Sequence, residues 1–142
     1  VDTVDFTFPA WEQLRSDFED EIIRADIIKQ AQLLVKDKHK HIQDSIEDDA
    51  QLVMFEGLEI LAINATVDGS FMGNALIERK PPMSIVWVES KDDIHIGLRS
   101  NGDVDVGAIA KKYGGGGHPK ASGFGWPLGK EKPWKVIKSD EK

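Results

Sequence analysis

Four consecutive glycines followed by a His-Pro step form the stretch of this sequence best suited to chemistry. They lie within residues 113–124, which read YGGGGHPKASGF. Glycines expose backbone N–H groups without side chains in the way, and such groups bind anions, above all at the start of a helix. A flexible linker is the alternative, but the run is short, lies between apolar-patterned segments and lacks the serines and charges of spacers. We therefore predict an anion cradle formed by Gly114, Gly115, Gly116 and Gly117.

The His-Pro step suggests how such a cradle would be completed. Pro119 suits the first position of a helix, which would place His118 at the N-cap and direct the N–H groups of the next turn towards a phosphate or carboxylate. His118 would then donate to the anion or stack on a base. A capping and packing role for His118 is the alternative interpretation.

Three more residues join the candidate site. Arg99 follows a predicted strand, where ligands of α/β folds commonly bind, and its planar fork suits a phosphate; a surface salt bridge is the alternative. Ser100 comes directly after it. Asn74 follows a glycine inside a predicted helix, although both residue types weaken helices, so we expect a packing or ligand reason for the pair.

Known catalytic signatures are missing from the sequence. It contains no Walker-type glycine-lysine motif and no GxSxG, HExxH or CxxC pattern, nor a cluster of Asp and His able to hold two metal ions. The sequence therefore predicts a binding surface without catalytic residues and without a cofactor of its own.

Strand patterns recur from residue 51 onward. The predicted strands are residues 52–55, 60–63, 83–88, 94–98 and 124–126, with a further candidate at 134–137. The first two are close enough to form a hairpin. In the fourth, His95 alternates with apolar residues and is interpreted as a solvent-facing strand residue.

Helices alternate with these strands. The predicted helices are residues 70–80, with Ser70 as N-cap, residues 104–113, capped by Asp103 or Asp105 and ended by Gly114, and a small helix after His118. The order of elements predicts an α/β fold, with a mixed β-sheet of about five strands and flanking helices.

The first third of the chain has a different character. Pro9 suits a first helical turn, and apolar residues recur at helical spacing from Trp11 to Val35, ahead of a polar segment at 36–49. This predicts a long amphipathic helix or helix pair, so residues 1–50 form a helical connector and residues 51–142 a second domain. Three roles are open for the apolar stripe of this helix: it packs within the protein, it covers a neighbouring domain, or it pairs with a second copy so that the N-terminal helix mediates a homodimer.

Composition limits the classes of function. The net charge is −7, and residues 1–50 carry all of the acidic excess, with 13 acids and 6 bases. Such a total argues against a long non-specific duplex-binding surface, although local basic residues leave a short nucleic acid open. The chain has no cysteine, no apolar run long enough for a membrane span and no signal-like start. We expect a cytoplasmic protein without membrane contacts.

The predicted second domain, residues 51–142, resembles the DHH-associated C-terminal domain of DHH-family phosphoesterases. The resemblance covers roughly residues 51–126. It rests on LRS at 98–100, DVDV at 103–106, IA at 109–110, GGGGH at 114–118 and ASGF at 121–124, with GNAL at 73–76 where the family has a helix of this kind. Ser122 stands where Ala is more usual, a mild departure. Residues 1–50 are similar in character to the connector between the family's two domains.

The resemblance implies a division of labour. In this family, which includes RecJ-like exonucleases, short-oligonucleotide hydrolases and cyclic dinucleotide phosphodiesterases, an N-terminal DHH domain binds two Mn²⁺ or Mg²⁺ ions that activate water. The C-terminal domain holds the substrate through its glycine-rich loop and Arg. The resemblance thus implies that this chain is the substrate-binding domain of a longer phosphohydrolase and is inactive by itself. Its implied ligand is a short oligonucleotide or a (cyclic) dinucleotide, and its implied partner is the catalytic DHH domain. A stand-alone nucleotide or short-RNA binding module and a helix-mediated scaffold are the alternatives.

Overall fold

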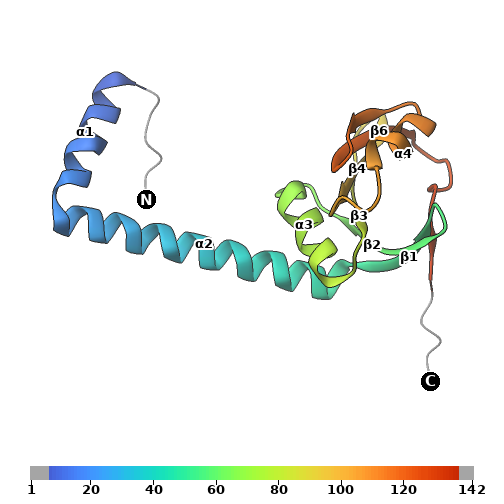
Figure 1. The fold of residues 1–142 in the computed structure, drawn as a ribbon, viewed down its shortest axis with the longest axis horizontal. Helices are drawn as coiled ribbons and strands as arrows, with labels where there is room; N and C mark the ends of the chain where they lie inside the picture. The colour runs from blue at the N-terminus through green and yellow to red at the C-terminus, as the bar shows by residue number, and fades with distance from the viewer. Residues whose placement is uncertain (1–6, 138–142) are drawn as a thin grey trace. The chain divides into compact units, whose positions relative to one another are not determined.

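The computed structural model describes residues 7–137, so the outer ends of both predicted domains, 1–6 and 138–142, lie outside the described residues (Figure 1). The described part consists of two compact units, which meet between His41 and Ile42 within α2. The helices are α1 (Phe8–Glu19), α2 (Glu21–Asp49), α3 (Gly69–Arg79) and α4 (Val106–Lys112). The strands are β1 (Gln51–Phe55), β2 (Leu58–Asn64), β3 (Met83–Glu89), β4 (Asp93–Ser100), β5 (Gly116–His118), β6 (Ala121–Pro127) and β7 (Lys135–Val136).

The first unit is helical, as predicted, and takes the form of a helix pair. Pro9 lies in the first turn of α1. Asp20 separates the two helices, and its Oδ1 accepts hydrogen bonds from the N–H groups of Ile22 and Ile23, as an N-cap carboxylate does. The polar segment 36–49 is itself helical and belongs to α2. No helix within residues 7–137 has the length and apolar character that a membrane span requires.

The second unit is built on one mixed sheet, so the predicted α/β class is confirmed. Its strand order is β5-β6-β4-β3-β2-β1-β7; β2 and β3 are parallel, and every other neighbouring pair is antiparallel. The sheet has seven strands rather than about five. The predicted hairpin is present as β1 and β2, joined by Glu56 and Gly57 with φ of 51° and 78°, the left-handed values that a tight hairpin turn requires.

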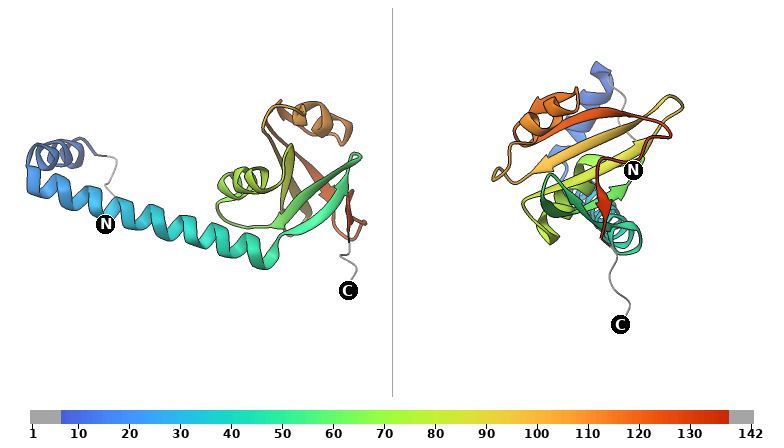
Figure 2. Two further views of the ribbon diagram at one scale, coloured as in Figure 1. Left: turned by 60° about the horizontal axis from the view of Figure 1, so that its bottom comes forward. Right: turned by 90° about the vertical axis from the view of Figure 1, so that its right-hand side faces the viewer.

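The two faces of the sheet carry different helices. The even-numbered residues of β4, Ile94, Ile96 and Leu98, are buried in one core together with residues of α4. Val86 of β3 points to the other face, where it packs with α3 and with the last turns of α2. Figure 2 shows α3 and α4 separated by the strands. The face beneath α3 is therefore the one that carries the odd-numbered side chains of β4.

Two local predictions were wrong. Ser70 is not the N-cap of α3; Asp68 takes that position with φ of 55°, and Ser70 lies in the first turn. The small helix after His118 is absent, because β5, Pro119, Lys120 and β6 form a hairpin in which His118 pairs with Ala121. Pairing of β6 with β4 along its whole length outweighs the weak local preference of this Ala-Ser-Gly segment.

Candidate functional site

Residues on neighbouring strands form three rows across the open face of the sheet. Residues directly opposite each other in antiparallel strands point to the same face, so the register of β3, β4, β6 and β5 defines the rows. The first row is Ser84, Arg99, Ala121 and His118; the second is Val86, Gly97, Gly123 and Gly116; the third is Val88, His95 and Gly125.

Glycines give this face a floor made of backbone. Gly97, Gly123 and Gly116 fill the second row after Val86, Gly125 ends the third row, and none of them carries a side chain. Added side chains would meet open space at Gly116 but would lie 3.3 Å from the Val86 carbonyl oxygen at Gly97 and 2.9 Å from the Ile96 carbonyl oxygen at Gly123. The floor is thus bare, and at Gly97 and Gly123 the neighbouring backbone leaves little space for a side chain.

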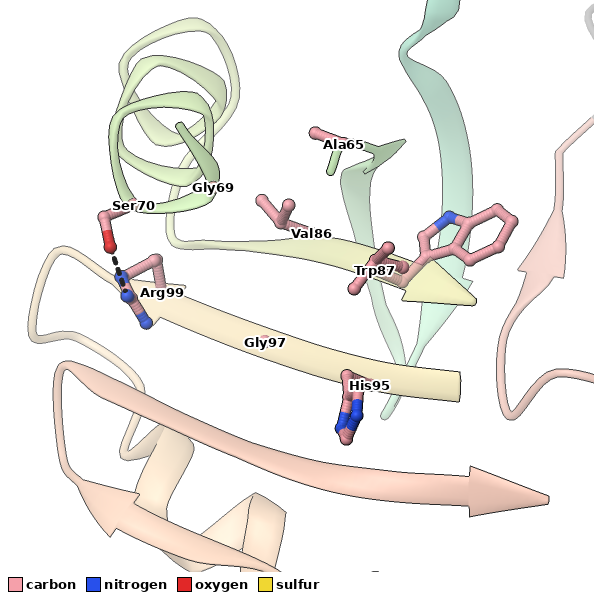
Figure 3. Close-up of a pocket in the computed structure, with 9 residues that line it drawn as sticks. Ala65, Gly69, Ser70, Val86, Trp87, His95, Gly97 and Arg99 are labelled. Atoms are coloured by element: carbon pink, nitrogen blue, oxygen red, sulfur yellow. Dashed lines mark hydrogen bonds between the residues drawn. The ribbon is translucent and has the colours of Figure 1, made fainter. Parts of the chain in front are cut away.

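A cavity of about 300 Å³ lies on this face beside α3 (Figure 3). Gly69 and Ser70 of α3 form one wall, Val86 and Val88 of β3 contribute apolar surface, and His95, Gly97 and Arg99 of β4 line the remainder. A pocket of this size lies at the lower end of the range for small-ligand sites.

Arg99 is held in place by α3. Its Nη2 donates to Ser70 Oγ at 2.8 Å and its Nη1 donates to the Leu98 carbonyl oxygen at 3.1 Å. Both acceptors are neutral, so these bonds orient the guanidinium without neutralising its charge. The stem of Arg99 crosses Gly73, where an added Cβ would lie 2.7 Å from Arg99 Cγ. The packing reason expected for the Gly-Asn pair in this helix is therefore confirmed for Gly73.

A buried hydroxyl fixes α3 to the sheet beneath it. Ser84 is fully buried, and its Oγ donates to the Gly73 carbonyl oxygen at 2.7 Å. This bond joins β3 to the turn of α3 that Arg99 crosses. Because β3 is also paired with β4 next to Arg99, the position of the arginine is set from both sides.

The glycine run serves packing more than the predicted cradle. Gly114, with φ of 82°, and Gly115 end α4 in a Schellman motif, in which their N–H groups donate to the carbonyl oxygens of Lys111 and Ala110. The predicted helix end at Gly114 is confirmed. The helix N-terminus that was to supply the cradle is absent, the N–H groups of Gly114 and Gly115 are already bonded, and Gly116 and Gly117 lie in the β5–β6 ladder. Anion binding by the glycine run therefore stays a prediction, without the helix that motivated it.

Close contacts explain two of the four glycines, Gly115 and Gly117. A Cβ on Gly115 would lie 2.1 Å from the Gly123 carbonyl oxygen, and one on Gly117, whose φ is 141°, would lie 2.6 Å from Ser122 Cα. The Ser122 hydroxyl donates to the Val106 carbonyl oxygen at 2.6 Å and so ties β6 to α4.

Of the remaining predicted site residues, His118 and Asn74 are exposed, whereas Ser100 is buried on the opposite face of the sheet. His118 is exposed and ends the row that contains Arg99. Asn74 is exposed on α3, one turn after Ser70 and hence on the same side of the helix. Ser100 lies apart from them, because it is buried on the opposite face and its Oγ accepts a hydrogen bond from the Gly102 N–H at 3.0 Å.

Sequence reasoning missed that His95 and Gly97 belong to the same surface as Arg99. His95 does face solvent, with its side chain 63% exposed. The signal was present in the alternation of residues 94–99, because a period of two places positions 95, 97 and 99 on one face of a strand. The glycines of β6 could be added only once its register with β4 was known.

A polar cluster supports the glycine run from the rim of the sheet. Glu56, in the β1–β2 turn, accepts hydrogen bonds from Lys112 Nζ at 2.5 Å and from the Tyr113 hydroxyl at 2.7 Å. The hydrogen bond from Lys112, and then that from Tyr113, lower the pKa of Glu56. Burial, and then the bond to Glu56, raise the pKa of Tyr113 to about 12. The tyrosine ring also stacks on Phe124, 4.6 Å between centroids, so the cluster fixes the end of α4 just before the glycines.

The metal ions implied by the family resemblance do not fit the side chains present. Within residues 7–137, no group of three or more His, Cys, Asp or Glu side chains could hold a metal ion. His95 has one carboxylate near it, that of Asp93, whose Oδ1 lies 3.3 Å from Nε2. We derive no chemical step through a metal from these residues.

Comparisons with known proteins agree with the resemblance. The family model of the DHHA1 domain matches residues 60–136. The chain is 29% identical over 108 residues to the oligoribonuclease NrnB of Bacillus subtilis, covering 75% of this chain and 25% of NrnB. It is 41% identical over 70 residues to the uncharacterized protein R106 of Acanthamoeba polyphaga mimivirus, covering 46% of this chain and 17% of R106. The chain thus spans a quarter or less of these curated relatives.

A solved structure shares the fold. The pGpG-specific phosphodiesterase PggH from Vibrio cholerae superposes with a TM-score of 0.59 at 15% identity, over 87% of this chain and 47% of PggH. At that identity the match concerns the fold alone. The match covers most of this chain but less than half of PggH.

Proposed function

The chain belongs to the DHHA1 domain family, associated with DHH-family phosphoesterases, and from that membership we propose that it is the part of a phosphodiester-hydrolysing enzyme that binds the substrate. The proposed ligand is a short oligonucleotide or a dinucleotide, linear or cyclic. The proposed contacts are Arg99, His118 and the glycine floor beside them, with Asn74 at the edge. Ser100 supports the turn that follows Arg99.

One observation carries this proposal: Arg99 and His118 lie in the same row of one sheet face, with only Ala121 between them and a row of glycines alongside. Neighbouring strands lie about 4.8 Å apart, so two strand spacings separate the Cα atoms of these residues by roughly 10 Å. Gly97, Gly123 and Gly116 leave room beside that row for an extended, flat ligand. An arginine fork at one end suits a phosphate, and an exposed imidazole at the other suits a phosphate or a base.

The relatives make an oligoribonucleotide the better supported ligand class. NrnB is named an oligoribonuclease, and it shares 29% of its residues with this chain over the matched region. Hydrolysis itself is proposed to depend on a separate DHH domain that binds Mn²⁺ or Mg²⁺. The chain by itself would then bind its ligand without cleaving it.

A titration of the purified 142-residue chain with a 5′-phosphorylated diribonucleotide tests the proposal. We expect Arg99→Ala to weaken binding at least 10-fold, because it removes a charge-assisted phosphate contact. Arg79→Ala is the matched control, since Arg79 lies on α3 but bonds to Gln43 and Glu47 instead of lining the cavity. Equal losses in both variants would show that only the general charge matters. Cleavage of the ligand by this chain with Mn²⁺ would refute the division of labour.

A second candidate is an interaction scaffold, favoured by the first unit. α1 has no buried residue, and α2 exposes Leu33, Leu34 and Val35 by more than half. A homodimer through these helices would cover them. Sedimentation of the chain over a range of concentrations separates this candidate from nucleotide binding, because Arg99→Ala leaves a helix-mediated dimer unchanged.

A further inference from the structure

The cavity beside α3 extends beyond Arg99 to a residue that the proposed function leaves unused. His95 lies four positions earlier on β4, on the same face, with Gly97 halfway between them. At about 3.3 Å per residue, the two Cα atoms are roughly 13 Å apart. Figure 3 shows both side chains along one strand with the bare position of Gly97 between them. No side chain of β4 therefore lies between the two residues on this face.

The ring of His95 is held by its edge. Its Nε2 lies 3.3 Å from Asp93 Oδ1, and the same carboxylate oxygen accepts a hydrogen bond from Ser90 Oγ at 2.7 Å. These contacts anchor Asp93, and through it His95, to the β3–β4 turn. Contact at the edge leaves the ring faces as the surface that a ligand would meet, and the side chain is 63% exposed.

The neighbours of His95 on the two flanking strands also favour a flat ligand group. Val88 lies opposite His95 on β3, and Gly125 lies opposite it on β6. One side of the ring therefore borders an aliphatic side chain. On the other side Gly125 has no side chain of its own, and the Asp93 carboxylate lies beside it, with Oδ2 3.2 Å from the position of an added Cβ. Bases stack on aromatic rings in surroundings of this kind, and their stacking does not require a particular base.

On the premise of the proposed function, we propose that His95 is the base-stacking residue for the nucleotide whose phosphate Arg99 binds. The cavity then forms a subsite for one nucleotide, with the phosphate at the α3 wall, the sugar over Gly97 and the base against His95. A surface ion pair between His95 and Asp93 is the competing explanation, and it assigns the residue no contact with the ligand.

The test separates phosphate binding from base binding by choice of ligand. Adenosine 5′-monophosphate and ribose 5-phosphate carry the same phosphate and sugar, but only the first has a base. Dissociation constants for both are measured by NMR titration of the full chain and of His95→Ala, His95→Phe and Arg99→Ala. His41→Ala, which removes a helical histidine from the first unit, is the matched control.

We expect His95→Ala to weaken binding of adenosine 5′-monophosphate by about 10-fold, the effect of losing one base–aromatic stack, and to leave ribose 5-phosphate binding unchanged. His95→Phe retains the affinity, and Arg99→Ala weakens both ligands. If His95→Ala affects both ligands alike, or neither, the assignment of His95 is wrong while phosphate binding through Arg99 stands. If Arg99→Ala changes neither ligand, or the wild-type chain binds neither, the proposed function itself fails.

Discussion

Replacing Gly115 or its neighbour Gly116 by alanine should give opposite effects on stability. The Cβ of Gly115→Ala would lie 2.1 Å from the Gly123 carbonyl oxygen and 2.5 Å from Phe124 Cβ. Both atoms belong to β6, which is paired with β4 on one side and β5 on the other and cannot move aside without loss of pairing. Overpacking costs about 1–3 kcal/mol in general, and contact with fixed backbone places this variant near about 3 kcal/mol.

Gly116→Ala is the matched control, because it adds the same methyl group one residue later. No atom lies within 4 Å of the position its Cβ would occupy. An alanine accepted without strain stabilises a protein by about 0.4–1 kcal/mol, since it restricts the unfolded chain. The free energies of unfolding of the two variants should therefore differ by about 3 kcal/mol or more.

Urea denaturation followed by tryptophan fluorescence measures this difference, because three of the four tryptophans, Trp87, Trp126 and Trp134, lie in the sheet unit. With an m value of about 2 kcal/mol/M, a loss of 3 kcal/mol lowers the midpoint by about 1.5 M. Equal midpoints for Gly115→Ala and Gly116→Ala would mean that the run is a flexible linker after all, and that its close contact with β6 does not form.

Three further predictions concern the elements around the site. Tyr113 is the only tyrosine, so ultraviolet absorbance should show tyrosinate forming near pH 12 instead of 10.0; its stabilising effect is complete below pH 10.0 and disappears towards pH 12, and a midpoint at 10.0 would contradict its burial. Glu56, whose pKa is lowered from 4.5, stabilises the fold above pH 4.5 and ceases to do so as the pH falls through its folded value, so Glu56→Gln should flatten the acid side of a plot of unfolding free energy against pH. Gly73→Ala should displace Arg99 and weaken nucleotide binding several-fold in the titration described above. The urea midpoint should change little, because the gain of about 1 kcal/mol from alanine in the helix offsets the cost of displacing the arginine stem. Unchanged affinity would show that the position of Arg99 is not critical.

Much of the fold follows from local patterns. The strands at 83–88 and 94–98, the β1–β2 hairpin and the end of α4 at Gly114 all have signals within a few residues: alternation, turn residues and a left-handed C′ position. Asp105 caps α4, as one of the two predicted options, because its carboxylate accepts the hydrogen bond of the Ala108 N–H. In each case the deciding interaction is short-range.

The parts that could not be predicted depend on distant partners. β5 has almost no side chains, so it carries no alternation, and only pairing with β6 makes it a strand. Ser70 has the residue type of an N-cap, but its hydroxyl is bound by Arg99, which lies 29 positions later. The face shared by His95, Gly97 and the glycines of β6 depends on a register that no local pattern encodes.

Gly73 shows how a local inconsistency in sequence can reveal a site. A glycine inside a helix costs about 1 kcal/mol relative to alanine, and helix stability alone would favour its replacement. The cost is offset outside the helix. Without a Cβ, Gly73 lets the Arg99 stem cross α3, so that the guanidinium reaches Ser70, while Ser84 holds the same turn from below. An alanine would strengthen the helix and displace the arginine. The glycine therefore makes sense only if the position of Arg99 matters more to the protein than the stability of α3.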